Sequence, residues 1–186
     1  MIQELITACE WASNPYFLFS GNVFSNLIYY SHLTPIVVSL ALGAYVYFSN
    51  RKSLINKALF LVTLIMGMWL LLDLILWATD SIDLVMFAWS LVNMLEPIIY
   101  AGFVYIVYVF VLGRDIGWKT KILLVLPLLP SMLGTATSWN ILGFNLTNCD
   151  REVIEGPLAF YNYAIEIGYS IWIACIGIWN TFRSTS

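Results

Sequence analysis

The sequence predicts an all-α membrane protein: a polytopic transmembrane helix bundle with five spans, its N-terminus outside and its C-terminus inside. Of the 186 residues, 61% are hydrophobic and only 10% are charged, a composition too apolar for a soluble domain of this size. The charged residues cluster, and the gaps between clusters are long enough for helices that cross a bilayer. The chain also contains 8 Trp, 11 Tyr and 11 Phe, as expected of aromatic belts at membrane interfaces.

The first 26 residues contain no span and are predicted to be an extracytoplasmic leader. Apolar residues near its start recur at helical spacing, which predicts a short amphipathic helix at the membrane interface. A leader without regular structure is the alternative.

Residues 27–183 are predicted to form the bundle, because polar runs divide this region into apolar stretches. The first three spans end at the runs 49–52, 79–81 and 113–115, and the fourth contains two prolines. The expected spans are 27–48, 57–77, 84–112, 122–142 and 158–182, with a polar loop at 143–157.

The basic residues predict the orientation of the bundle. Seven of the eight lie on one side, and only Arg151 lies in the loop between the fourth and fifth spans. Cytoplasmic connections carry an excess of Lys and Arg, so this side is predicted to be the inside. The seven are Arg51, Lys52, Lys57, Arg114, Lys119, Lys121 and Arg183.

The third span carries Asn93, Glu96 and Pro97 near its middle. An acidic side chain at the centre of a membrane helix costs about 2.5 to 3.5 kcal/mol on insertion scales. Such a residue therefore indicates a polar pocket, a proton path or an ion site. The proline removes a helical hydrogen bond and can kink the span.

Three further ionisable side chains lie within the predicted spans, all in the outer half. At 1.5 Å per residue, His32 is roughly 8 Å deep, Asp73 roughly 10 Å and Glu166 roughly 12 Å. Helical spacing places Asn93, Glu96 and Tyr100 on one face of the third span. Comparable faces occur in the second and fifth spans. The predicted ligand-binding residues are Glu96, Asn93, Tyr100, Asp73, Trp69, Glu166, Asn162 and His32.

If these faces meet, they line an outward-opening pocket of carboxylates, amides and aromatic rings. This chemistry suits a small polar or cationic ligand, because carboxylates and aromatic faces both attract cations. The alternative is structural: buried acids and amides can hydrogen-bond neighbouring helices and specify their packing.

Other functions find no support in the sequence. There is no catalytic motif, no cofactor motif and no metal-ligand spacing. The net charge of −3 does not indicate nucleic-acid binding. Cys9 and Cys149 both fall on the predicted outer side, where an oxidising compartment would allow a disulfide. Two unpaired thiols are the alternative, since sequence does not determine pairing.

Five runs and a proline-rich fourth span give the chain a distinctive pattern: SNRKSLINKALFLVTLIMGMW, LLDLILWATD, WSLVNMLEPIIYAGFVYIVYVF, GRDIGWKTK and NLTNCDREVIEGPLAFYNY. In this pattern the chain resembles the seven-transmembrane N-terminal sensor region of bacterial histidine kinases. The resemblance covers most of residues 27–183. The chain has five spans where the family has seven, and no kinase follows. It is therefore either a piece of a longer receptor or a short relative with another role.

The resemblance implies a bacterial inner-membrane receptor module of a two-component system. Such a module is a homodimer and passes a signal through its last helix to a cytoplasmic kinase domain or partner. Together with the acidic set, it predicts a non-catalytic sensory or ligand-binding module. The alternatives are a structural or accessory subunit of a larger membrane assembly and a small proton-coupled transporter.

Overall fold

Four long helices make up most of the described chain in the computed structural model, which describes residues 27–79, 81–145 and 152–184. The helices are α2 (Leu27–Ser49), α3 (Leu54–Ala78), α4 (Ile82–Leu112) and α7 (Pro157–Ser184). All four are long and apolar enough to cross a membrane. The prediction of a mostly helical fold is therefore confirmed, and the length and composition of these four helices suggest a membrane protein. The predicted leader helix, Cys9 and Cys149 lie outside the described residues.

The ends of these helices follow from local chemistry. Ser53 precedes α3 and its hydroxyl accepts a hydrogen bond from the main-chain N–H of Asn56, as an N-cap does. Helix α4 ends at Gly113, which has a φ of 65° and donates its N–H to the carbonyl of Val109. This left-handed conformation is readily available to glycine.

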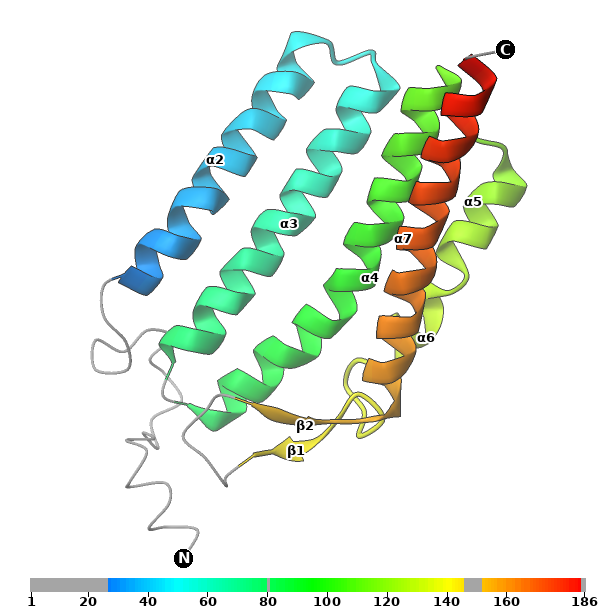
Figure 1. The fold of residues 1–186 in the computed structure, drawn as a ribbon. Coiled ribbons are helices and arrows are strands. Elements are labelled where there is room, and N and C mark those ends of the chain that lie inside the picture. Colours follow the sequence, from blue (N-terminus) through cyan, green and yellow to red (C-terminus); the bar gives the residue numbers. More distant parts are fainter. Residues whose placement is uncertain (1–26, 80, 146–151, 185–186) are drawn as a thin grey trace, which may run out of the picture.

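The predicted fourth span, 122–142, is wrong as a single helix. The chain instead forms two short helices, α5 (Trp118–Val125) and α6 (Leu128–Gly134), followed by a turn. Pro127 and Pro130 explain the break, because each lacks an N–H and its ring collides with the preceding helical turn. The two helices together still lead from the end of α4 towards the start of α7 (Figure 1).

Two tyrosines of α7 donate hydrogen bonds to main-chain carbonyl groups of this broken segment, one in the last turn of α5 and one at the start of α6. The Tyr169 hydroxyl donates to the carbonyl of Leu124 at 2.6 Å, and the Tyr161 hydroxyl donates to the carbonyl of Pro127 at 3.0 Å. Hydrogen bonds of this kind, from side chains of a neighbouring helix, make a break in a helix tolerable.

The strictly all-α prediction is also wrong, because two short antiparallel strands form a β-hairpin that begins at the end of the predicted fourth span and continues into the predicted polar loop. Strand β1 (Ile141–Phe144) pairs antiparallel with β2 (Val153–Glu155), with Ile141 opposite Glu155 and an irregularity before Gly143. These strands are three and four residues long, too short for alternating polarity to identify them.

The elements run back and forth between two ends of the bundle, with α4 between α3 and α7 (Figure 1). One end carries the β-hairpin; we call it the hairpin end. The other carries the α2–α3 turn, the α4–α5 connection and the end of α7; we call it the basic end. The seven basic residues predicted to share one side belong to elements at the basic end.

Candidate functional site

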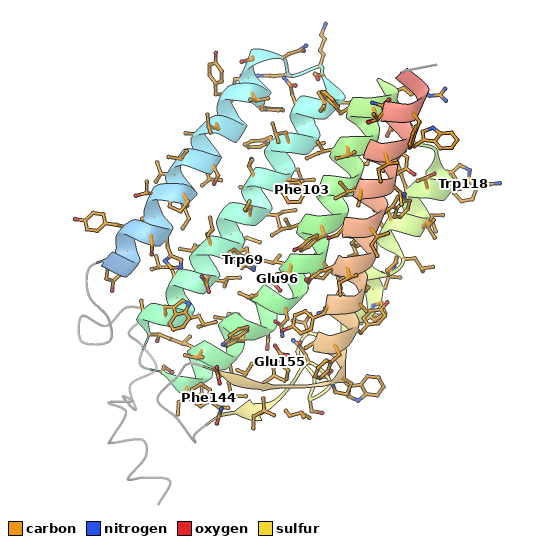
Figure 2. All side chains as sticks on the ribbon, viewed as in Figure 1. Trp69, Glu96, Phe103, Trp118, Phe144 and Glu155 are labelled. Carbon is orange, nitrogen blue, oxygen red and sulfur yellow. The ribbon has the colours of Figure 1, made fainter. Side chains whose placement is uncertain are left out.

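A cavity of about 400 Å³ lies over one face of α4, between α3 and α7. Figure 2 shows Trp69, Glu96 and Phe103 along this region. Each helix contributes residues three or four positions apart, which face the same side of a helix. The lining residues are Met66, Trp69, Glu96, Ile99, Tyr100, Phe103, Tyr163 and Glu166.

Glu96 is held at the cavity by a neighbouring helix. The indole Nε1–H of Trp69 donates to Glu96 Oε1 at 3.1 Å. Helix α4 continues through Pro97, and this hydrogen bond links the Glu96 carboxyl group to α3. The second carboxyl oxygen remains available to a ligand or to water.

Glu166 brings a second carboxyl group to the same cavity from α7. Its Oε1 atom is buried and has no hydrogen-bond partner among the described residues. A buried polar atom without a partner is destabilising by about 1 to 3 kcal/mol. This atom is therefore the clearest sign in the cavity of an additional group that it could bind.

A third carboxyl group borders the cavity at the hairpin end. The Tyr163 hydroxyl donates to Glu155 Oε1, which links the start of α7 to the end of β2. Figure 2 shows Glu155 on the hairpin side of Glu96. The acidic character of the cavity thus continues towards the hairpin end of the bundle.

Aromatic rings form much of the remaining lining. Trp69, Tyr100, Phe103 and Tyr163 come from three different helices. Ring faces carry partial negative charge and attract cations, most strongly where water is excluded. Two carboxyl groups and four rings make a favourable setting for an organic cation. In contrast, no group of three potential metal ligands occurs among the residues that the structure describes.

The cavity opens on the flank of the bundle. Met66, Phe103 and Tyr163 are each more than a third exposed (38%, 37% and 38%), and they come from the three helices that frame it. A group bound here would therefore lie between α3 and α7, against the middle of α4.

Two of the predicted site residues, Asn93 and Asn162, do not line this cavity. They are 4% and 3% exposed, and belong to a buried amide cluster with Asn140 and Ser131. The Asn93 amide donates to Asn140 Oδ1 at 3.1 Å, and the Ser131 hydroxyl donates to Asn162 Oδ1 at 2.5 Å. The cluster joins α4, α6, α7 and the turn before β1.

The same cluster replaces the helical hydrogen bond that Pro97 removes. Proline has no N–H, so the carbonyl of Asn93, four residues earlier, loses its helical donor. Asn162 supplies a replacement, because its Nδ2 donates to that carbonyl at 2.8 Å. The structural role that buried amides can have therefore accounts for the contacts of this pair.

His32 and Asp73 form a third, separate group. His32 Nε2 lies 2.9 Å from Asp73 Oδ2, which joins α2 to α3. Their side chains are 15% and 25% exposed, respectively. The predicted set of eight therefore divides into four cavity residues (Trp69, Glu96, Tyr100 and Glu166), two amides and one pair.

Four residues that line the cavity, and one acid that borders it, are not among those predicted from the sequence: Met66, Ile99, Phe103 and Tyr163, and Glu155. Helical spacing was the available signal for the four lining residues. Met66 is three residues before Trp69, Ile99 and Phe103 follow Glu96, and Tyr163 precedes Glu166. Glu155 had no such signal, because its position depends on the hairpin.

Comparisons with protein-family models, curated proteins and solved structures found no match to this chain. The class of protein is therefore defined by fold and site alone. It is a mostly helical bundle of membrane type, with an acidic, aromatic-lined cavity on the flank of its central helix.

Proposed function

We propose that this protein is a membrane-embedded sensory module that binds a small organic cation in the cavity over α4. The observation that carries the proposal is the buried Glu166 Oε1 atom, which lacks a hydrogen-bond partner among the described residues and lies in a cavity with a second carboxyl group. The positive charge of a cationic ligand would interact favourably with this carboxyl group and offset the cost of placing acids in a membrane.

The ligand class follows from the lining. A metal ion would need several convergent oxygen ligands at short distances, whereas most of this cavity is aromatic or aliphatic. An alkylammonium group matches both parts, because its charge faces the carboxyl groups and its carbon surface contacts the rings. A volume of about 400 Å³ lies within the range of small-molecule sites, which is roughly 300 to 1,000 Å³.

Signal transmission is proposed through the last helix. Helix α7 contributes Glu166 and Tyr163 to the cavity, and it runs from the hairpin end to the basic end. A ligand that draws Glu166 towards Glu96 would bias the position of α7 against α4. In a receptor of the histidine-kinase type, that shift would reach a cytoplasmic kinase domain or partner at the end of α7.

A ligand panel tests the proposal. The thermal unfolding temperature of the purified protein would be measured with organic cations, organic anions and neutral compounds, in the wild type and in Glu96→Gln. We expect stabilisation by one or more cations in the wild type and a smaller shift in Glu96→Gln. The absence of any cation-dependent shift in the wild type would count against a cation site.

The second candidate is an accessory subunit of a larger membrane assembly, and the lateral opening of the cavity favours it. A helix of another protein, carrying a Lys or Arg, could cover Glu96 and Glu166 from the flank. This candidate predicts that a partner co-purifies from native membranes with the wild type. The same partner would be lost from a Glu96→Gln/Glu166→Gln variant that still folds.

A further inference from the structure

A second hollow, of about 480 Å³, lies on the opposite face of α4 and extends to the basic end. On α4 it is lined by Ile98, Ala101, Gly102 and Tyr105, whereas the acidic cavity uses Glu96, Ile99, Tyr100 and Phe103. At about 100° per residue, these two sets point to opposite sides of the helix. The two hollows are therefore separate sites.

Small residues line the floor of this groove, and the groove opens on the flank of the bundle. Ala58, Ala101 and Gly102 form its floor, where α3 and α4 approach closely. Leu61 of α3 and Val125 of α5 are 55% and 50% exposed at its rims. Of the fourteen lining residues, eleven are apolar. The groove is thus an apolar channel that faces the surroundings of the bundle.

The length of the groove matches one leaflet of a membrane. Its lining on α3 extends from Leu54 to Ile65, which is about 17 Å at 1.5 Å per residue. The hydrocarbon core of a bilayer is about 30 Å thick, so one leaflet contributes about 15 Å. An acyl chain anchored at the basic end would therefore fill the groove along its length.

Charge lies at the end of the groove where a lipid headgroup would be. Two of its three residues with polar side-chain groups are Lys57 and Lys121, at the starts of α3 and α5. Lys121 Nζ contacts Asp115 at 2.5 Å, and both side chains are 44% exposed. Lys57 forms no ion pair within the described residues. The segments at the basic end contain seven basic residues and a single acidic residue, Asp115.

We propose that this groove binds an anionic phospholipid from the leaflet at the basic end. The acyl chain lies on the floor of small residues, and the headgroup phosphate contacts the ammonium groups of Lys57 and Lys121. Basic pockets between membrane helices bind anionic headgroups in this way. A free anion would leave the apolar channel unfilled, and an apolar helix would not engage the lysines.

Lipid titration of the purified full chain, followed by native mass spectrometry, tests the proposal. The probes are phosphatidylglycerol and phosphatidylcholine with the same acyl chains. Near a membrane surface each lysine contributes about a fivefold factor, so Lys57→Gln/Lys121→Gln is expected to lose roughly 25-fold in phosphatidylglycerol affinity. The matched control is Lys52→Gln/Lys119→Gln, which removes the same charge from the same connections without touching the groove.

The control pair is expected to lose fivefold or less. A third variant, Ala58→Phe, fills the floor and is expected to weaken both lipids alike. Equal losses in the two lysine pairs, or equal binding of both lipids to the wild type, would overturn the proposal. A wild-type dimer that dissociates in Ala58→Phe, with no lipid effect of the lysines, would assign the groove to a second copy instead.

Discussion

Asn162 donates a hydrogen bond of 2.8 Å to the main-chain carbonyl of Asn93, the acceptor that Pro97 leaves without its helical donor. One side chain of α7 thereby completes the backbone of α4. The bond fixes the packing of α4 against α7 close to Glu96 and Glu166, so the geometry of the acidic cavity depends on it.

The bond between Asn162 and Asn93 predicts coupling between Asn162 and Pro97. In a Pro97→Ala background, the new N–H can reach the Asn93 carbonyl, so Asn162→Ala should be less destabilising there than in the wild type. We expect a coupling of about 0.6 to 1.7 kcal/mol, the range of interhelical hydrogen bonds in membranes. A double-mutant cycle of unfolding free energies measures it. Strict additivity of the two substitutions would contradict this account.

Trp69→Phe should destabilise the protein, because it removes the indole donor that holds Glu96 Oε1. The expected loss is about 1 to 3 kcal/mol in unfolding free energy. Trp118→Phe is the matched control, because Trp118 is 68% exposed on α5 (Figure 2). It should change stability by no more than about 0.5 kcal/mol. Equal effects of the two substitutions would argue against the Trp69–Glu96 contact.

Gly102→Ala should destabilise the contact between α3 and α4. A Cβ at this position would lie 2.5 Å from Val62 Cγ2, and such overpacking costs about 1 to 3 kcal/mol. Adding Val62→Ala removes the clashing atom and leaves Val62 Cβ at 3.8 Å. The double variant should therefore be more stable than the sum of the single effects predicts, in the same unfolding assay.

Gly168→Ala provides the control for Gly102→Ala. Apart from the backbone of its own helical turn, no atom of the described residues lies within 4 Å of the Cβ that this substitution would add in α7. Replacing a helical glycine by alanine then stabilises by about 0.5 to 1 kcal/mol. A loss of stability in Gly168→Ala similar to that in Gly102→Ala would show that close helix approach is not the cause.

The contacts of Asp115 predict a pH dependence at the basic end. The hydrogen bond from Lys121, supported by that from Tyr105, lowers the pKa of Asp115 below its ordinary value of 3.8. A carboxyl group with a lowered folded-state pKa stabilises the fold above its unfolded pKa, and the contribution is lost as pH falls through the folded pKa. Asp115→Asn should therefore lower the unfolding temperature slightly at neutral pH.

The difference between Asp115→Asn and the wild type should shrink as the pH falls below 3.8. Melting curves of both proteins across the acidic range measure it. The effect is expected to be small, since both Asp115 and Lys121 are well exposed. A constant difference at every pH would mean that the Asp115 carboxylate does not contribute through its charge.

The long helices could be predicted from the sequence because their signal is local. Each is a run of apolar residues longer than a bilayer requires, and each ends at a polar cluster. The broken segment was partly visible in Pro127 and Pro130, but the donors that make the break tolerable come from Tyr161 and Tyr169, far along the chain. A pattern within one stretch of sequence does not predict hydrogen-bond donors that come from a distant helix.

The candidate site could be predicted only as a set of residue types. Depth in a helix placed Glu96, Glu166 and Asp73 in one half of the bundle, but it did not determine which neighbours they meet. Asp73 faces α2 and pairs with His32, whereas Glu96 of α4 and Glu166 of α7 line the same cavity. Helix rotation and neighbour order decide this division, and both are tertiary properties.

The most direct test of the cation site compares choline with its neutral counterpart, the alcohol in which a tert-butyl group replaces the trimethylammonium group. Equilibrium binding of both would be measured in the wild type, in Glu166→Gln and in the control Glu152→Gln, which changes an exposed acid outside the cavity. The account predicts that choline binds the wild type and the control at least tenfold more tightly than its neutral counterpart, a difference of about 1.4 kcal/mol. It also predicts that Glu166→Gln loses this preference. Equal binding of the two compounds to the wild type, or an undiminished preference in Glu166→Gln, would contradict the central claim.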